Sequence, residues 1–239
     1  MNSTLLRSNK WLLGIPLFIM NIGFAQEEGA VIGFVGFAGT FPPQTNITIT
    51  TDQGVCGHRI LDEEFVVDPV THGLTNVIVF WERPSEEQSI SQDNTVITVS
   101  QINCRYVPHV QVGSPGAILE FVNNDGILHN VHVYDSEKET LFNLAQPGFK
   151  KKLQHKLETE DNVVSFRCDV HKWMNGYVLL LKNAAYTITD SNGQFRLEGI
   201  NNGTQKIHFW HEGLGKAVRT VEIVPGEEAV LDLVIEANN

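Results

Sequence analysis

The sequence has few helix signals, few long apolar runs and few basic residues. Short apolar runs replace sustained helical periodicity, and after residue 25 no segment approaches the roughly 20 apolar residues that cross a bilayer. Lys and Arg number 17 against 28 Asp and Glu among 239 residues, a formal net charge of -11. Because nucleic acids and anionic membranes repel a negative surface, we expect the chain to bind neither.

The N-terminal segment has the pattern of a secretory signal. Arg7 and Lys10 precede a ten-residue apolar core at 11–20, and Gly23 and Ala25 supply the small residues that signal peptidase requires. Residues 1–25 are therefore predicted to be a cleaved signal peptide, and the mature protein to be secreted or periplasmic without a membrane span. An uncleaved anchor is the alternative. Without the two basic residues of this segment the net charge becomes about −13.

Cysteine and methionine are also scarce, with three of each. An odd number of cysteines in an exported chain needs an explanation. Cys168 lies in a metal-site context, described below, so Cys56 and Cys104 remain as an even pair. Export permits a disulfide between them, and we predict one, with two buried free thiols as the alternative.

Short runs rich in Val, Ile, Phe and Thr recur about every ten residues, separated by Gly, Pro, Asn and Asp. This spacing is typical of β-sandwiches, so the predicted fold class is all-β. A polar stretch at 83–94 contains Pro84 and lacks apolar periodicity, and we interpret it as a linker. The segments are then a first flank (29–82), the linker (83–94), a central block (95–183) and a second flank (184–237).

The central block contains a spacing of possible metal ligands. Cys168, His171 and Met174 follow one another at intervals of three, and Met174 is the one methionine left after signal removal. A thiolate, two imidazoles and a long axial thioether make a mononuclear copper site that transfers electrons. The second imidazole is predicted to be His129, which opens a strand after an Asn-Asp-Gly turn.

Strand periodicity supports this assignment. Val164, Phe166 and Cys168 alternate and therefore share one face of a strand, which directs the thiolate inward. Two alternatives remain: Cys168 is a plain core thiol, or the intact site takes another metal or another axial ligand.

These motifs resemble those of the cupredoxins. The C-x2-H-x2-M loop is like that of amicyanin, and N-N-D-G-x-x-H-N at 123–130 is like the plastocyanin segment. The resemblance implies a Greek-key β-sandwich with one type 1 (blue) copper ion held by His129, Cys168, His171 and Met174. It also implies that Asn130 ties the ligand segments together by hydrogen bonds. The glycine that precedes the aromatic residue in many cupredoxins is absent here.

The two flanks, taken together, resemble a second family. The segment T-D-x-x-G-x-F-x-L-x-x-I-x-x-G at 189–203 is similar to carboxypeptidase regulatory-like domains, which are transthyretin-type β-sandwiches. Gln205 departs from the aromatic residue usual there. The first flank supplies the opening of that motif, at 32–35 and 76–79, so we predict that the cupredoxin is inserted into this sandwich. Exported methylamine-utilisation and plastocyanin-like proteins resemble this arrangement.

The sequence bears on three classes of function. The leading prediction is a carrier of single electrons between exported redox proteins such as a cytochrome or a dehydrogenase, with Trp173 beside His171 as an electron exit patch or as a loop anchor. The alternative is a copper-binding or carbohydrate- or protein-binding structural module; an exposed aromatic platform of Trp81, Tyr186 and Trp210 would favour it. An enzyme is not expected, because the H-x-H pairs of multicopper oxidases are missing and the ligand loop holds one cysteine.

Overall fold

The computed structural model describes residues 28–236 except 42, 85–94 and 160. The predicted signal peptide and most of the predicted linker lie outside these residues. Strands dominate the described part of the chain, whose one helix, α1 (Gln53–Cys56), has four residues, so the all-β prediction is confirmed. No helix within these ranges is long and apolar enough to cross a membrane.

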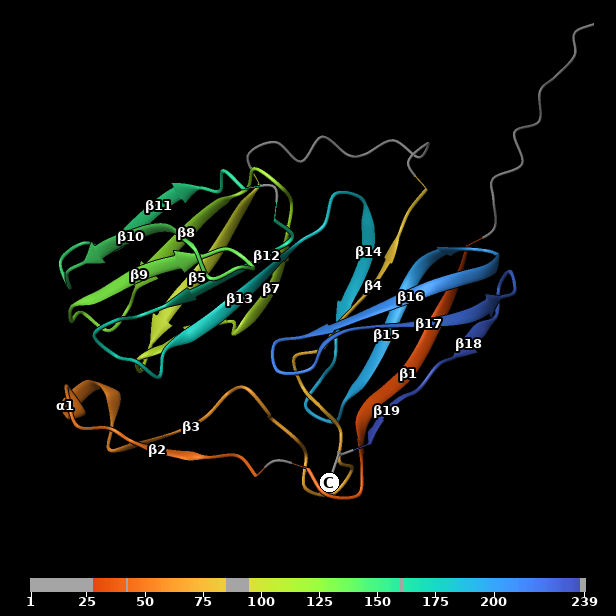
Figure 1. The fold of residues 1–239 in the computed structure, drawn as a ribbon, viewed down its shortest axis with the longest axis horizontal. Coiled ribbons are helices and arrows are strands. Elements are labelled where there is room, and N and C mark those ends of the chain that lie inside the picture. The colour runs from red at the N-terminus through yellow and green to blue at the C-terminus, as the bar shows by residue number, and fades with distance from the viewer. Residues whose placement is uncertain (1–27, 42, 85–94, 160, 237–239) are drawn as a thin grey trace, which may run out of the picture.

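The central block forms a two-layer β-sandwich (Figure 1). Both layers are mixed sheets, because β13 pairs parallel to β7 and β5 pairs parallel to β8. The first sheet consists, in order, of β10 (Thr140–Gln146), β9 (His129–Tyr134), β12 (Val163–Arg167), β13 (Asn175–Leu180) and β7 (Val110–Gly113). The second consists of β11 (Lys152–Lys156), β8 (Ile118–Asn123), β5 (Val96–Ile102) and β6 (Arg105–Val107).

Strands from both ends of the chain build a second, outer sandwich. β1 pairs antiparallel with β15 through partners such as Gly33 and Phe195, and parallel with β19 through Val35 and Leu233. One sheet contains β15 (Gln194–Asn201), β1 (Glu28–Ala38), β18 (Glu228–Val230) and β19 (Leu233–Glu236). The other contains β14 (Ala184–Ile188), β4 (Ile78–Glu82), β16 (Gly203–His211) and β17 (Gly215–Ile223). The central sandwich is therefore inserted between strands of one outer sandwich.

Alternation along the strands produces the two cores. In β15, Phe195 and Leu197 are buried while Gln194 and Arg196 face solvent. In β12, Val164 and Phe166 are buried, and the Phe166 ring packs edge-on against Tyr106 at a centroid distance of 5.0 Å. Each sandwich therefore buries the face that the period-two pattern marks as apolar.

Much of the first flank does not belong to the outer sandwich. Residues 43–62, called the arm below, leave β1 and cross to the central sandwich, as Figure 1 shows at its lower edge. The arm contains β2 (Asn46–Thr48), α1 and β3 (Arg59–Leu61). Its Ile49 and Ile60 are buried in the central core. The segment leaves its own domain because its apolar side chains are buried in the neighbouring one.

The two sandwiches also meet through an apolar interface and a buried ion pair. Ile78 and Trp210 of the outer sandwich cluster with Leu179 of the central one. Beside them, a ring nitrogen of His109 contacts the carboxylate of Glu212, and both side chains are almost fully buried. Burial alone would lower the pKa of His109, but the hydrogen bond and charge of Glu212 outweigh it and raise that pKa. The imidazolium form therefore contributes to domain contact.

This pair predicts a pH-dependent contribution to stability. The folded-state pKa of His109 lies above the unfolded value of about 6.5. The stabilisation that the ion pair gives to the folded protein is therefore fully present below a pH of about 6.5, and it is lost as the pH rises through the folded-state pKa. His109→Gln should lower the free energy of unfolding by about 1.5–3 kcal/mol at pH 6, as expected for a hydrogen bond to a charged group. Denaturant titrations from pH 6 to 9 should show the difference from wild type shrinking. His58→Gln, at an exposed position, is the control, and a pH-independent difference would contradict the prediction.

Candidate metal centre

The structure brings the four predicted ligands to one end of the central sandwich. His129 is the first residue of β9, Cys168 follows β12 directly, and His171 and Met174 lie in the loop to β13. The Cys168 N–H donates to the Met174 carbonyl at 3.1 Å, and the Met174 N–H donates to the His171 carbonyl at 2.8 Å. These bonds fold the loop back on itself. All four side chains are at most 1% exposed.

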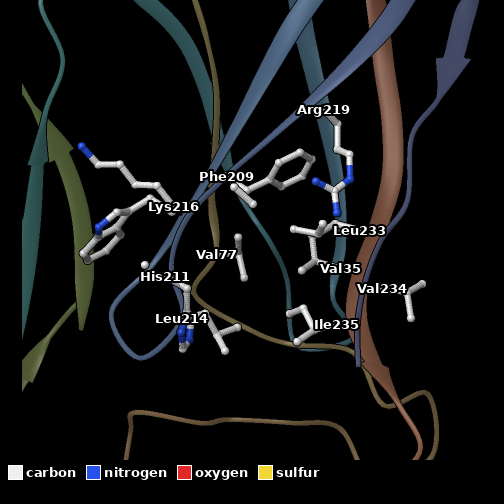
Figure 2. Close-up of a pocket in the computed structure, with 13 residues that line it drawn as sticks. Val35, Val77, Phe209, His211, Leu214, Lys216, Arg219, Leu233, Val234 and Ile235 are labelled. Atoms are coloured by element: carbon white, nitrogen blue, oxygen red, sulfur yellow. The ribbon is translucent and has the colours of Figure 1, made fainter. Parts of the chain in front are cut away.

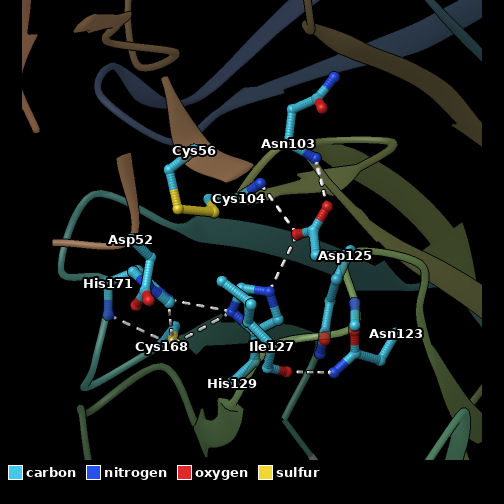
Figure 3. Close-up of polar contacts among 12 residues, drawn as sticks. Asp52, Cys56, Asn103, Cys104, Asn123, Asp125, Ile127, His129, Cys168 and His171 are labelled. Carbon is cyan, nitrogen blue, oxygen red and sulfur yellow. Dashed lines mark hydrogen bonds and ion pairs between the residues drawn. A yellow bond between two sulfur atoms is a disulfide. The ribbon is translucent and has the colours of Figure 1, made fainter. Parts of the chain in front are cut away.

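The donor atoms have separations that suit a single ion. Nδ1 of His129 lies 3.0 Å from Nδ1 of His171, and Sγ of Cys168 lies 3.9 and 3.8 Å from these two nitrogens (Figure 3). An ion with bonds of about 2.0–2.1 Å to imidazole and 2.3 Å to thiolate reaches all three. Met174 is fully buried in the same core cluster as Cys168. The donor set of two imidazoles and one thiolate, with the Met174 thioether in the same core cluster, fits copper.

The protein favours the metal-binding thiolate form of Cys168. Burial alone would raise the pKa of Cys168, but hydrogen bonds from His129, His171 and backbone N–H groups lower it to about 6. One of these is the His171 N–H, whose nitrogen lies 3.4 Å from Sγ. A thiol that ionises this easily loses less free energy when it gives up its proton to a metal ion.

Two carboxylates, neither of them predicted as a site residue, hold the outer edges of the imidazoles. Asp125 Oδ2 lies 2.9 Å from Nε2 of His129, and Asp52 Oδ2 lies 3.0 Å from Nε2 of His171. Each carboxylate accepts the Nε2 proton and so directs Nδ1 toward Cys168, which Nδ1 hydrogen-bonds in the metal-free protein. An ion would bind Nδ1 after displacing the proton of that hydrogen bond. Carboxylate–histidine–metal arrangements orient ligands in this way. Asp125 stands inside the turn motif and could have been found there, whereas Asp52 comes from the arm, 119 residues from its partner.

Asn130 joins β9 to the ligand loop. Its Oδ1 accepts a hydrogen bond from the Asp169 N–H at 2.5 Å, and its Nδ2 donates to the Asp169 carboxylate at 2.8 Å. Nδ2 also donates to Oδ1 of Asn143 on β10 at 2.9 Å. Asn130 therefore fixes the residue after Cys168 relative to the strand that carries His129.

Trp173 lies against the turn between β5 and β6. Its Nε1–H donates to the Cys104 carbonyl at 3.1 Å, and its half-buried ring lies 5.3 Å from that of His171. These contacts favour the loop-anchor interpretation over an exposed exit patch.

A disulfide joins the arm to that same turn. Cys56 and Cys104 are bonded, with their Cα atoms 5.1 Å apart, and Cys168 is the one free cysteine. In Figure 3 the disulfide lies beside Asp52 and Asp125. The arm, the disulfide and the two carboxylates together cover the imidazole edges.

The aromatic side chains proposed for a binding platform are not gathered on one surface. Trp81 and Trp210 are buried in the cores, and only Tyr186 is exposed. The outer sandwich has instead a largely apolar groove of ≈ 250 Å³ between β17 and β19 (Figure 2). Phe209, Leu233 and Ile235 line it together with Trp210, and none of the predicted metal ligands does.

Comparisons with known proteins find partial matches among solved structures alone. No family model matches the chain, and a search of curated proteins finds no significant match. Among solved structures, an amicyanin variant in the Cu(I) state is 18% identical, covering 39% of this chain and 96% of its own, with a TM-score of 0.31. A purple cupredoxin from Nitrosopumilus maritimus is 23% identical, covering 36% of this chain and 99% of its own, with a TM-score of 0.29. The likeness to carboxypeptidase regulatory-like domains stays a prediction.

Proposed function

We propose that the protein is an exported carrier of single electrons that uses one copper ion at the Cys168 site. The separation of the three donor atoms, 3.0 to 3.9 Å within a fully buried cluster, is the observation that supports this most directly. A bound copper ion would supply the Cu(I)/Cu(II) couple. A trigonal set of two imidazoles and a thiolate with a weak axial thioether is the arrangement of blue-copper electron-transfer sites.

The surrounding residues suit a centre that changes little when an electron arrives. Asp52 and Asp125 hold the imidazoles from behind, and Asn130 fixes the loop to β9. Ligands held by such outer contacts keep their positions in both oxidation states. Burial of all four ligands leaves no open position for a substrate, so we infer that the protein is not an enzyme.

The partner is proposed to be a redox protein such as a cytochrome or a dehydrogenase. The excess of acidic residues across the chain would attract a partner with a basic docking face and raise its association rate. That attraction would weaken as the ionic strength rises.

Voltammetry of the copper-loaded protein tests this function. We expect one reversible one-electron wave that persists over repeated cycles, because the ligand cage stays closed. Cys168→Ser should remove the wave, and His58→Gln, at an exposed position of the arm, should leave it unchanged. An irreversible wave in the wild type with metal lost on reduction would contradict electron transfer and favour a structural copper-binding module.

A further inference from the structure

The ligands of the copper site have no open route to solvent. His129, Cys168, His171 and Met174 are at most 1% exposed, and the arm lies over the edge of His171 through Asp52. The arm contacts the edge of His171, and the turn between β5 and β6 contacts Trp173 of the ligand loop, so movement of either segment would open the site. Cys56 and Cys104 stand at the junction of these two segments.

The two sulfur atoms of this disulfide belong to a cluster of atoms that can bind a metal ion. The ligand atoms of Cys56, Cys104 and His171 all lie within 4.8 Å of one another, and all three residues are buried. Cys104 forms a second such group with Asp125 and His129. The sulfur of Cys104 therefore borders both imidazoles of the copper site.

Contacts other than the disulfide hold both cysteines in place. The Cys104 N–H donates to Asp125 at 2.9 Å, and Trp173 donates to the Cys104 carbonyl. On the arm, the Cys56 N–H donates to the Asp52 carbonyl at 2.9 Å within α1. Arg105 binds the arm at the Leu61 carbonyl at 3.0 Å, and Ile49 and Ile60 are buried in the central core. Reduction of the disulfide would therefore leave two thiols facing each other.

We propose that Cys56 and Cys104, in the dithiol state, form a second metal site that binds one Cu(I) ion and is the entry point to the Cys168 site. Paired thiolates select soft ions such as Cu(I). A dithiol reductant supplies two electrons and two protons to the disulfide and itself becomes a disulfide. Each cysteine then loses its proton when its sulfur binds the ion.

Binding is tested in a chain that lacks the first site, so the result does not depend on the proposed electron transfer. Cu(I) is added anaerobically to Cys168→Ser in its dithiol and disulfide states, in competition with bicinchoninate. A phosphine, which becomes the phosphine oxide, prepares the dithiol state. The dithiol form should bind one Cu(I) at least about tenfold more tightly, a difference of about 1.4 kcal/mol. Cys56→Ser with Cys104→Ser in the same background, under the same phosphine, should match the disulfide form.

Equal affinity in both states of Cys168→Ser would overturn the site. Circular dichroism of each state shows that folded chains are being compared, and a dithiol state that binds Cu(I) no more tightly when folded than in denaturant would overturn it as well. The entry role has its own readout, the rate at which the wild type gives up Cu(I) to bicinchoninate. The dithiol form should release the ion at least about tenfold faster, the ratio that a barrier lowered by about 1.36 kcal/mol produces. Equal release rates would leave a second site without an entry role.

Discussion

Replacing both Cys56 and Cys104 by serine is expected to lower the free energy of unfolding of the metal-free protein by about 4 kcal/mol. This is the chain-entropy value for the loop that the disulfide closes. The disulfide joins residues separated by 48 positions, and its main effect is to restrict the unfolded chain. Equilibrium denaturation followed by tryptophan fluorescence measures the change, with Trp173 beside the bridge as the local probe.

Cys168→Ser is the control for this first prediction, because it places the same hydroxyl at a buried cysteine that has no bridge. It should cost clearly less in the metal-free protein. A loss below about 1 kcal/mol for the double variant would mean that the arm is held almost wholly by its other contacts, or that the unfolded chain is already compact.

Cys168→Ser is expected to abolish most of the stabilisation that copper gives to the folded protein. An ion that binds only the folded state, at a free concentration a thousand times its Kd, adds about 4.1 kcal/mol to the free energy of unfolding. Loss of the thiolate should raise Kd at least about 100-fold, which at the same copper concentration leaves about 1.4 kcal/mol. Thermal unfolding with and without Cu(II) measures both values.

His155→Gln supplies the matched control for the copper experiment, because it removes an exposed histidine of β11, which lies outside the predicted ligand set. It should keep the full stabilisation. Equal stabilisation of the wild type and Cys168→Ser would show that copper binds elsewhere, and the assignment of Cys168 as a ligand would fail.

Local pattern was enough to predict the all-β fold and to pick out four residues that the structure brings to one end of the central sandwich. Val164, Phe166 and Cys168 alternate, and the period of a β-strand places such residues on one face whatever the rest of the chain does. The spacing of Cys168, His171 and Met174 lies within one loop, so the sequence carries it directly. The two flanks resemble two parts of one family's motif, and this resemblance predicted that they form one outer sandwich. In the structure β1 of the first flank does pair with β15 of the second.

The arm could not be predicted, because its position depends on contacts between distant segments. Ile49 and Ile60 have an ordinary strand pattern, and nothing local says that they pack on the neighbouring sandwich. Asp52 reaches His171 only because the arm docks there. The burial of Trp81 and Trp210 likewise depends on which faces the two sandwiches share.

The visible spectrum of the mature protein during titration with Cu(II) tests the central claim most directly. The disulfide should be kept intact and Cys168 shown to be a free thiol beforehand. One intense blue band that saturates at a single equivalent, absent in Cys168→Ser and altered in Met174→Leu, is the result we predict. A protein that binds Cu(II) without such a band would contradict a thiolate–copper site made by these residues.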